Sequence, residues 1–284
     1  MSIEASSTSE YPGAKVRELA IPDVTVFGGD SQMDQVCWIC GNKADSAEHR
    51  IKKSDLVRAH GTGPYQGPAA VVHFQGGKET LIQGPRSNAI KYQKSLCQHC
   101  NTTYTQPFDH AYDGFIDWIM QNEQLVLHRM FIDFSEIFGS GWKNEQRGLY
   151  KYFAKSFGCR LINAGVDVPA DVVTLFGKNV FRTALRLTVA INKDVLLLPP
   201  HVRNGFIGKG ELLSLSPRHT PGLPIGFVWD EHVSWLTIGY WYNCLPTDNF
   251  PTWVADQQFI HLGVFYPLDG EMRTEFLEKV KNSQ

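Results

Sequence analysis

Two stretches, Cys37-Trp38-Ile39-Cys40 and Leu96-Cys97-Gln98-His99-Cys100-Asn101, decide how this chain folds. Each contains two cysteines separated by two residues, a spacing at which one tight turn directs two thiolates at a single ion. Two such pairs in a chain with six cysteines are typical of a tetrahedral four-thiolate zinc site. We therefore predict that a structural Zn²⁺ ion is held by Cys37, Cys40, Cys97 and Cys100.

Three polar residues next to the cysteine pairs predict chemistry at this site. Glu48-His49 follows the first pair, and Asn101 directly follows the second. If the cysteines meet around zinc, Glu48 and Asn101 come together and offer the oxygen ligands that Mg²⁺ or Mn²⁺ prefers. On an extended strand His49 points to the opposite face from Glu48, where it can activate a water against a phosphorus atom. The pattern predicts metal-assisted hydrolysis with Glu48, His49 and Asn101 as catalytic residues; the alternative for the Glu-His pair is an ordinary polar surface.

The order Cys-x-x-Cys, Glu-His and Leu-Cys-x-x-Cys-Asn resembles the HNH endonuclease family, in its bacterial zinc-stabilised subgroup. The resembling stretch covers residues 36–115. The resemblance implies a ββα-metal (His-Me) finger, in which a hairpin and a helix meet at one divalent ion. It further implies that His49 is the general base and that Glu48 and Asn101 bind the catalytic ion. The fold class expected on this basis is α+β, with a zinc-clamped HNH domain followed by a mixed domain of helices and antiparallel sheet.

The same resemblance implies that the substrate is DNA and that its phosphodiester bonds are hydrolysed. A single site cuts one strand at a time, so nicking is the expected product of a monomer. The family also implies a role in restriction or phage defence, with protein partners from such a system. The chain departs from the family pattern at the middle asparagine, which would fall near Tyr92.

Basic residues gather between the two cysteine pairs. Among them are Arg50, Lys52, Lys53, Arg58, Lys78, Arg86, Lys91 and Lys94. Few acidic residues oppose them, which is the pattern expected of a face that contacts phosphates. The substrate contacts predicted from this stretch are Arg50, Lys52, Lys53, Arg86 and Lys91. No helix suited to reading base edges is visible, so the sequence predicts no target sequence.

The composition is that of an ordinary globular protein. Of the 284 residues 43% are hydrophobic and 20% are charged, and the formal net charge is −2. This charge does not exclude DNA binding, because a local basic patch is enough to contact phosphates. We expect no membrane span, since no run of about eighteen apolar residues occurs, and the N-terminus lacks the pattern of a signal peptide. Cys159 and Cys244 are predicted to be buried free thiols, which favours the reducing cytoplasm.

The predicted organisation has three parts: a disordered tail at residues 1–12, the HNH nuclease domain at 13–125, and an accessory or regulatory domain at 126–284. Within the nuclease domain we expect a hairpin from strands at 70–74 and 79–82, and a helix after Asn101 with Pro107 in its first turn. Apolar spacing predicts further helices at 127–138, 144–157 and 271–281. Strands are expected at 185–191, 195–198, 225–229, 233–241 and 259–266.

Two other functions are compatible with the cysteine pattern. The first is a non-catalytic zinc-finger module that binds DNA or protein and keeps Glu48-His49 without using them. The second is a redox role for the cysteine pairs, against which bound zinc would count strongly. Loss of DNA nicking on replacement of His49 separates the nuclease from both.

Overall fold

The computed structural model describes residues 19–20, 35–67, 70–75, 78–177, 180–216, 224–246 and 250–282. The tail predicted at residues 1–12 lies outside these residues. The described chain combines helices with largely antiparallel sheets, so the predicted α+β class is confirmed. None of the described helices is long and apolar enough to cross a membrane.

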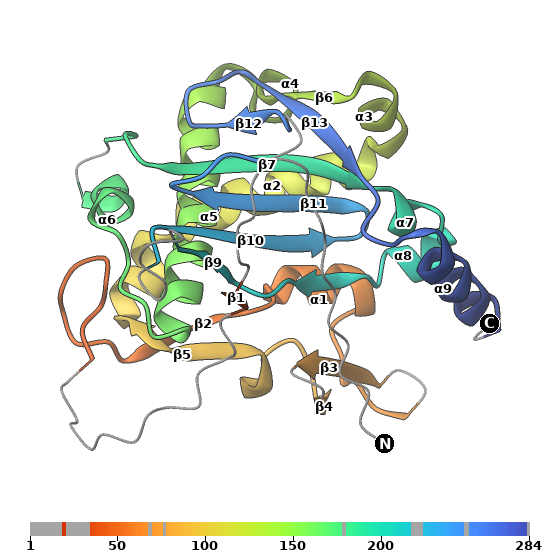
Figure 1. The fold of residues 1–284 in the computed structure, drawn as a ribbon. Helices are drawn as coiled ribbons and strands as arrows, with labels where there is room; N and C mark the ends of the chain where they lie inside the picture. The colour runs from red at the N-terminus through yellow and green to blue at the C-terminus, as the bar shows by residue number, and fades with distance from the viewer. Residues whose placement is uncertain are drawn as a thin grey trace.

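The largest sheet of the described chain has nine strands (Figure 1). They are β1 (Leu19–Ala20), β6 (Phe131–Asp133), β7 (Leu185–Asn192), β8 (Ile207–Lys209), β9 (Leu213–Leu215), β10 (Gly226–Val233), β11 (Leu236–Tyr242), β12 (Thr252–Trp253) and β13 (Phe259–Phe265). The order along the sheet is β1-β9-β10-β11-β7-β13-β6, with β12 paired to β7 and β8 paired to β10. These pairs are antiparallel except for β7 and β13, which run parallel.

The smaller elements lie mostly before and between these strands. The short strands are β2 (Ser46–His49), β3 (Val71–Gln75), β4 (Lys78–Ile82) and β5 (Lys91–Leu96). The helices are α1 (Lys53–His60), η2 (Asn88–Ile90), η3 (His99–Tyr104), α2 (Gln106–Gln121), α3 (Glu123–Arg129), α4 (Phe134–Phe138), η4 (Gly139–Gly141), α5 (Trp142–Asn163), α6 (Ala170–Gly177), α7 (Lys193–Leu196), α8 (Pro200–Arg203) and α9 (Gly270–Asn282). The predicted hairpin is β3–β4, and the helices predicted after Asn101, at 144–157 and at 271–281 are α2, α5 and α9.

Two predicted elements are wrong. The segment 195–198 is not a strand, because Asn192 ends β7 and its side chain accepts a hydrogen bond of 3.1 Å from the backbone N–H of Val195, which starts helix α7. The helix predicted at 127–138 is interrupted, because α3 ends at Arg129 and the next residue, Met130, has φ of 60°. The next three residues form β6 and pair with β13 before α4 begins. In both places sheet pairing and capping override apolar spacing.

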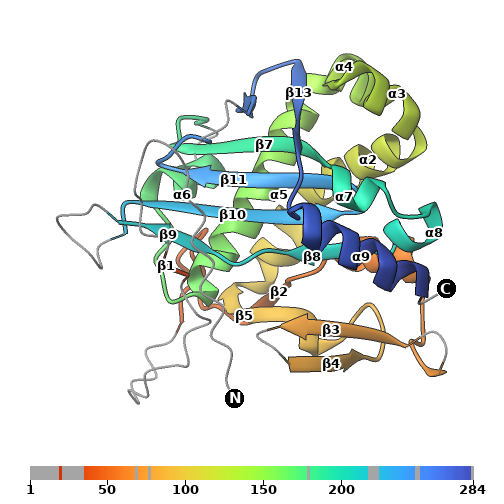
Figure 2. The same cartoon turned by 45° about the vertical axis from the view of Figure 1, so that its right-hand side comes forward.

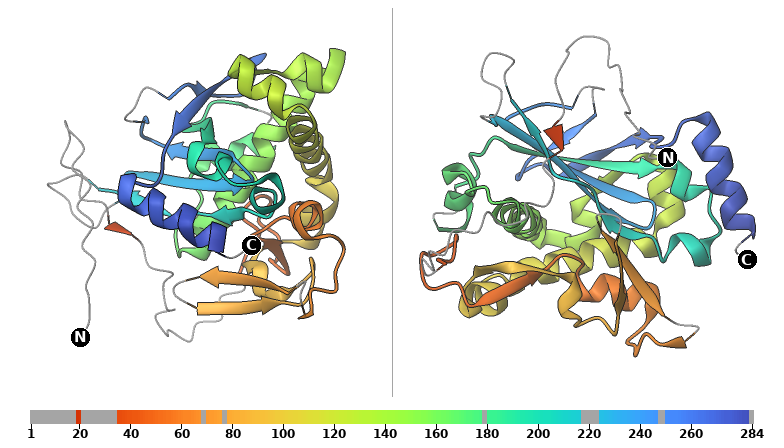
Figure 3. Two further views of the ribbon diagram at one scale, coloured as in Figure 1. Left: turned by 90° about the vertical axis from the view of Figure 1, so that its right-hand side faces the viewer. Right: turned by 60° about the horizontal axis from the view of Figure 1, so that its bottom comes forward.

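Helix α5 is enclosed by the rest of the protein. Fourteen of its 22 residues are buried, which is typical of a helix that contacts neighbours on all sides. On one side Phe157 stacks on Tyr240 of β11, with ring centroids 6.0 Å apart. On another side Tyr152 stacks on Tyr112 of α2 at 4.0 Å. Figure 1 and Figure 3 show α5 and α2 together against one face of the large sheet.

The segment from α1 to β5 lies along one edge of this assembly (Figure 2), with β2 paired to β5 and the β3–β4 hairpin beside them. One buried core extends from Phe108 on α2 to Leu262 on β13. It therefore crosses the predicted domain boundary at residues 125/126, and that division stays a prediction. Cys159 is buried and Cys244 is partly buried, and both are free.

An ion-pair network joins α1 to α2. Asp55 is 3% exposed, and its two carboxylate oxygens accept hydrogen bonds from Tyr112 Oη at 2.8 Å and Arg58 Nη1 at 2.7 Å. Arg58 also contacts Asp113 at 3.0 Å and Asp117 at 2.7 Å. Burial raises the pKa of Asp55 to about 6, although the hydrogen bond from Tyr112 and the charge of Arg58 act in the opposite direction.

This raised pKa predicts how stability depends on pH. The folded protein holds the Asp55 proton more tightly than the unfolded chain does, so the resulting stabilisation is complete at low pH and is lost as the pH rises through about 6. We expect the free energy of unfolding of the wild type to fall by about 1–2 kcal/mol relative to Asp55→Asn between roughly pH 5 and pH 7.5. Urea unfolding at several pH values measures this difference. Asp117→Asn, which removes a half-exposed carboxylate from the same arginine, is the control and should run parallel to the wild type.

Candidate functional site

The four predicted zinc ligands come together in the structure. Their sulfur atoms all lie within 4.8 Å of one another, and Cys40 Sγ and Cys97 Sγ are 3.6 Å apart. A tetrahedral zinc ion with Zn–S distances of about 2.3 Å requires sulfurs about 3.8 Å apart. The cluster of Cys37, Cys40, Cys97 and Cys100 can therefore hold zinc, as the sequence predicts.

Each cysteine pair is shaped by its own turn. In the first, Gly41 N donates to Cys37 O at 2.8 Å and Cys37 N donates to Asn42 O at 2.6 Å. Gly41 has φ of 79°, a conformation that glycine adopts without steric cost. In the second, Cys100 N donates to Cys97 Sγ at 3.4 Å. These bonds shape the two turns from which the four thiols project.

The first turn rests on helix α5 through Trp38. A methyl group on Gly158 would lie 2.7 Å from the Trp38 ring. The indole therefore packs directly on the backbone of α5, at a position where a residue larger than glycine would collide with the ring. The same ring meets Phe176 of α6 edge-on, with centroids 5.1 Å apart. The cysteine cluster is thereby attached to the second half of the chain.

The strand that carries Glu48 and His49 is irregular. Antiparallel pairing of β2 with β5 places Ala47 opposite Lys94 and His49 opposite Lys91, with a register shift between them. Glu48 lies in this shift and has no cross-strand partner. Such bulges redirect a side chain away from the regular alternation of a strand.

Asn101 contacts the same strand. Its Nδ2 donates to Ser46 Oγ at 2.9 Å and to Ala47 O at 3.3 Å. Its Oδ1 is buried and accepts no hydrogen bond from the described residues, and His49 Nε2 is buried with no partner among them. A buried polar atom left unpaired costs about 1–3 kcal/mol, so each of these atoms has the capacity to bind a water, an ion or a substrate atom.

The imidazole of His49 is suited to accept a proton. Burial lowers its pKa, and the charges of Lys91, Lys155 and Lys52 act in the same direction against Glu48. A lowered pKa keeps the ring neutral at physiological pH, which is the protonation state that a general base requires.

Glu48 binds a lysine that sequence reasoning did not identify. Lys155 of α5 is 1% exposed, and its ammonium lies 3.2 Å from Glu48 Oε2 and 3.3 Å from Asp109 Oδ1. Burial acts to lower the pKa of Lys155, but the charges of Glu48 and Asp109 outweigh this effect and the pKa is raised. The group is therefore a buried cation. In the sequence Lys155 ends the run Tyr150-Lys151-Tyr152-Phe153-Ala154-Lys155, which is typical of an amphipathic helix. The enclosure of α5 buries the lysine instead.

Two oxygen donors lie on the segments that follow the two cysteine pairs. A carboxylate from Glu48 and the unpaired amide oxygen of Asn101 come from the two segments that the cysteine cluster joins. Asp109, at the start of α2, is bound to Lys155 and to Lys52 Nζ at 2.9 Å. An ion bound to Glu48 would share the Glu48 carboxylate with Lys155.

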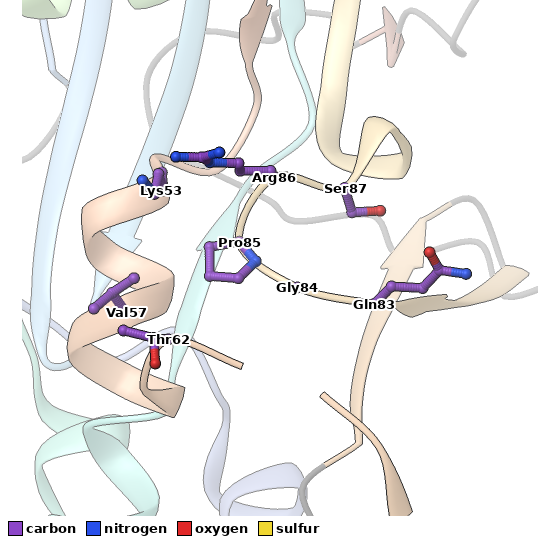
Figure 4. Close-up of a pocket in the computed structure, with 8 residues that line it drawn as sticks. All are labelled: Lys53, Val57, Thr62, Gln83, Gly84, Pro85, Arg86 and Ser87. Atoms are coloured by element: carbon purple, nitrogen blue, oxygen red, sulfur yellow. The ribbon is translucent and has the colours of Figure 1, made fainter. Parts of the chain in front are cut away.

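The predicted substrate-binding residues do not form one surface. Lys53 and Arg86 line a cavity of about 520 Å³ between α1 and the turn Gly84-Pro85-Arg86-Ser87 (Figure 4). Arg50 lines a different cavity of about 610 Å³, together with Arg160 and Lys209 of the second half.

The remaining two predicted contacts are partly buried. The ammonium of Lys52 forms an ion pair with Asp109, and its nitrogen lies 5.0 Å from the centre of the Tyr152 ring. Lys91 stands opposite His49 in the strand pair. Tyr92, which falls where the family pattern has its middle asparagine, is buried, with the Arg50 guanidinium 5.2 Å from the centre of its ring.

Comparison with known protein families, curated proteins and solved structures finds no match to this chain. The resemblance of residues 36–115 to the HNH family therefore rests on the pattern of cysteines, Glu-His and asparagine alone.

The sulfur cluster predicts that the purified protein carries one zinc ion per chain. Structural zinc contributes several kcal/mol to folding, and 1 kcal/mol shifts Tm by about 2–4 °C in a chain of this size. We expect Cys97→Ser to lose the zinc and to lower Tm by roughly 10 °C or more. Metal analysis and thermal melting measure both effects. Cys244→Ser, which removes a thiol outside the cluster, should keep the zinc; if Cys97→Ser also keeps it, the cluster is not the zinc site.

Proposed function

We propose that this chain is a metal-dependent DNA endonuclease that hydrolyses phosphodiester bonds and nicks one strand at a time. The proposal is supported above all by the contact of Asn101 with strand β2. Through it the residue after the second cysteine pair meets the strand that carries Glu48 and His49. This is the arrangement in which the HNH family combines a general base with a divalent ion. By that resemblance the activity belongs to restriction or phage defence.

Each residue has a distinct role in the proposed reaction. The neutral imidazole of His49 accepts a proton from the water that attacks the phosphorus atom. Glu48 and Asn101 would hold a Mg²⁺ or Mn²⁺ ion, which would supply electrostatic stabilisation of negative charge on the leaving oxygen. Lys53 and Arg86, which line the cavity beside α1, contact the phosphates of the DNA backbone.

A second function is favoured by the ion pair between Glu48 and Lys155. A carboxylate that already has a cationic partner is also what a non-catalytic zinc-finger module would contain. In that case the chain would bind DNA or a protein without cleaving it. Binding to labelled DNA without conversion of the substrate would identify this function.

The nuclease proposal predicts the effect of removing the general base. Supercoiled plasmid incubated with zinc-loaded full-length protein and Mn²⁺ should become nicked. Since a general base contributes about 10²–10⁴ in rate, we expect His49→Ala to reduce nicking by at least roughly 100-fold. Glu48→Gln and Asn101→Ala should raise the Mn²⁺ concentration needed for half-maximal nicking. Gel electrophoresis of the plasmid forms gives the rates.

The matched control is His128→Ala. His128 is exposed in the last turn of α3, and its replacement should leave nicking unchanged. The proposal fails if the wild type does not nick in Mg²⁺ or Mn²⁺, or if His49→Ala nicks at the wild-type rate.

A further inference from the structure

The buried ammonium of Lys155 stands between the N-terminal site and helix α2. Its nitrogen lies 3.2 Å from Glu48 Oε2, 3.3 Å from Asp109 Oδ1 and 3.3 Å from Thr105 Oγ1. An ammonium has three hydrogens to donate, and these three acceptors use them. The side chain is 1% exposed, so water does not compete for these bonds.

The charges close to this ammonium nearly cancel. Glu48, Asp109 and Asp113 bring three negative charges, and Lys155 and Lys52 bring two positive ones. Lys52 Nζ lies 2.9 Å from Asp109 Oδ1 and 3.8 Å from Asp113 Oδ2. A divalent ion added at Glu48 would leave an excess of positive charge in a poorly solvated place. Like charges close together in such surroundings repel strongly, so the ion and the ammonium cannot share Glu48 at little cost.

Lys155 can nevertheless keep an ion pair with a second carboxylate, that of Asp109, if it releases Glu48. Asp109 offers it two oxygens, at 3.3 Å and 3.4 Å. A lysine side chain is long and flexible, so its ammonium can release Glu48 while it keeps Asp109. Two arrangements of the same residues follow: Glu48 bound to Lys155, or Glu48 bound to an external cation with Lys155 on Asp109.

We propose that Lys155 is an internal cation that competes with the divalent ion for Glu48, and that helix α5 thereby sets the metal affinity of the site. The inference rests on the proposed nuclease function, since it concerns the ion of that reaction. Lys155 is a positioning residue, because it acts through the carboxylate of Glu48.

The test measures Mn²⁺ binding to zinc-loaded full-length protein without DNA, by the electron paramagnetic resonance signal of free Mn²⁺. Lys155→Met removes the competing charge and should lower the apparent Kd for Mn²⁺ at least tenfold, which corresponds to about 1.4 kcal/mol. Lys155→Arg keeps the charge and should stay near the wild type. The gain from Lys155→Met should vanish in the Glu48→Gln background, because a double-mutant cycle isolates the coupling of the two residues.

Lys151→Met controls for the loss of a buried lysine from the same helix. Its ammonium lies 5.2 Å from the centre of the Phe108 ring, and its removal should leave the Kd for Mn²⁺ unchanged. Circular dichroism establishes that each variant is folded.

Three results would overturn the inference: equal Kd values for the wild type and Lys155→Met, a gain that persists with Glu48→Gln, or no Mn²⁺ binding by any variant. Nicking by the wild type decides the proposed function separately. Nicking with an unchanged Kd in Lys155→Met rejects the competition alone. A tighter Kd without nicking by any variant rejects the nuclease and keeps the competition.

Discussion

The enclosure of helix α5 is the constraint on which the arrangement of the protein depends. One side of this helix stacks on the large sheet through Phe157 and Tyr240, and another stacks on α2 through Tyr152 and Tyr112. Residues 149–161 of this helix are all buried, so a lysine within them cannot reach water on any face. Lys155 is therefore stable only with carboxylates beside it, and strand β2 and helix α2 provide two that are partly buried. The same residues that complete the candidate site thus compensate a charge in the interior.

The parts of the fold that the sequence predicts well are those defined by local chemistry. The cysteine pairs, the β3–β4 hairpin and helices α2, α5 and α9 follow from turn residues and apolar spacing, and the structure contains all of them. The errors arise where tertiary contacts decide. Residues 131–133 pair with β13 inside a segment that has helical spacing, and Asn192 caps a helix in a segment that has the apolar residues of a strand. Neither effect is visible in a window of neighbouring residues.

The candidate site shows the same division. The sequence predicts that Glu48 and Asn101 come together, because the cysteine pairs lie beside them, and the structure places Asn101 against the strand of Glu48 through Ser46 and Ala47. It does not predict that Lys155 binds Glu48, since that pair depends on how α5 packs in the second half of the chain. The basic residues between the cysteine pairs are similarly distributed by packing: Lys53 and Arg86 line one cavity and Arg50 another, while Lys52 is held by Asp109. Charge in a sequence shows how many cations are present, and only the fold shows which of them share a surface.

The packing of Trp38 against Gly158 of α5 has a consequence for folding during synthesis. A ribosome releases both cysteine pairs well before it releases α5, so a nascent chain can gather its thiols while the indole of Trp38 still has no surface to cover it. The N-terminal segment reaches its final packing only when translation has passed residue 163. Chains that stop earlier lack the surface of α5 that covers this ring and packs on α2, and exposed apolar surface of this kind favours aggregation.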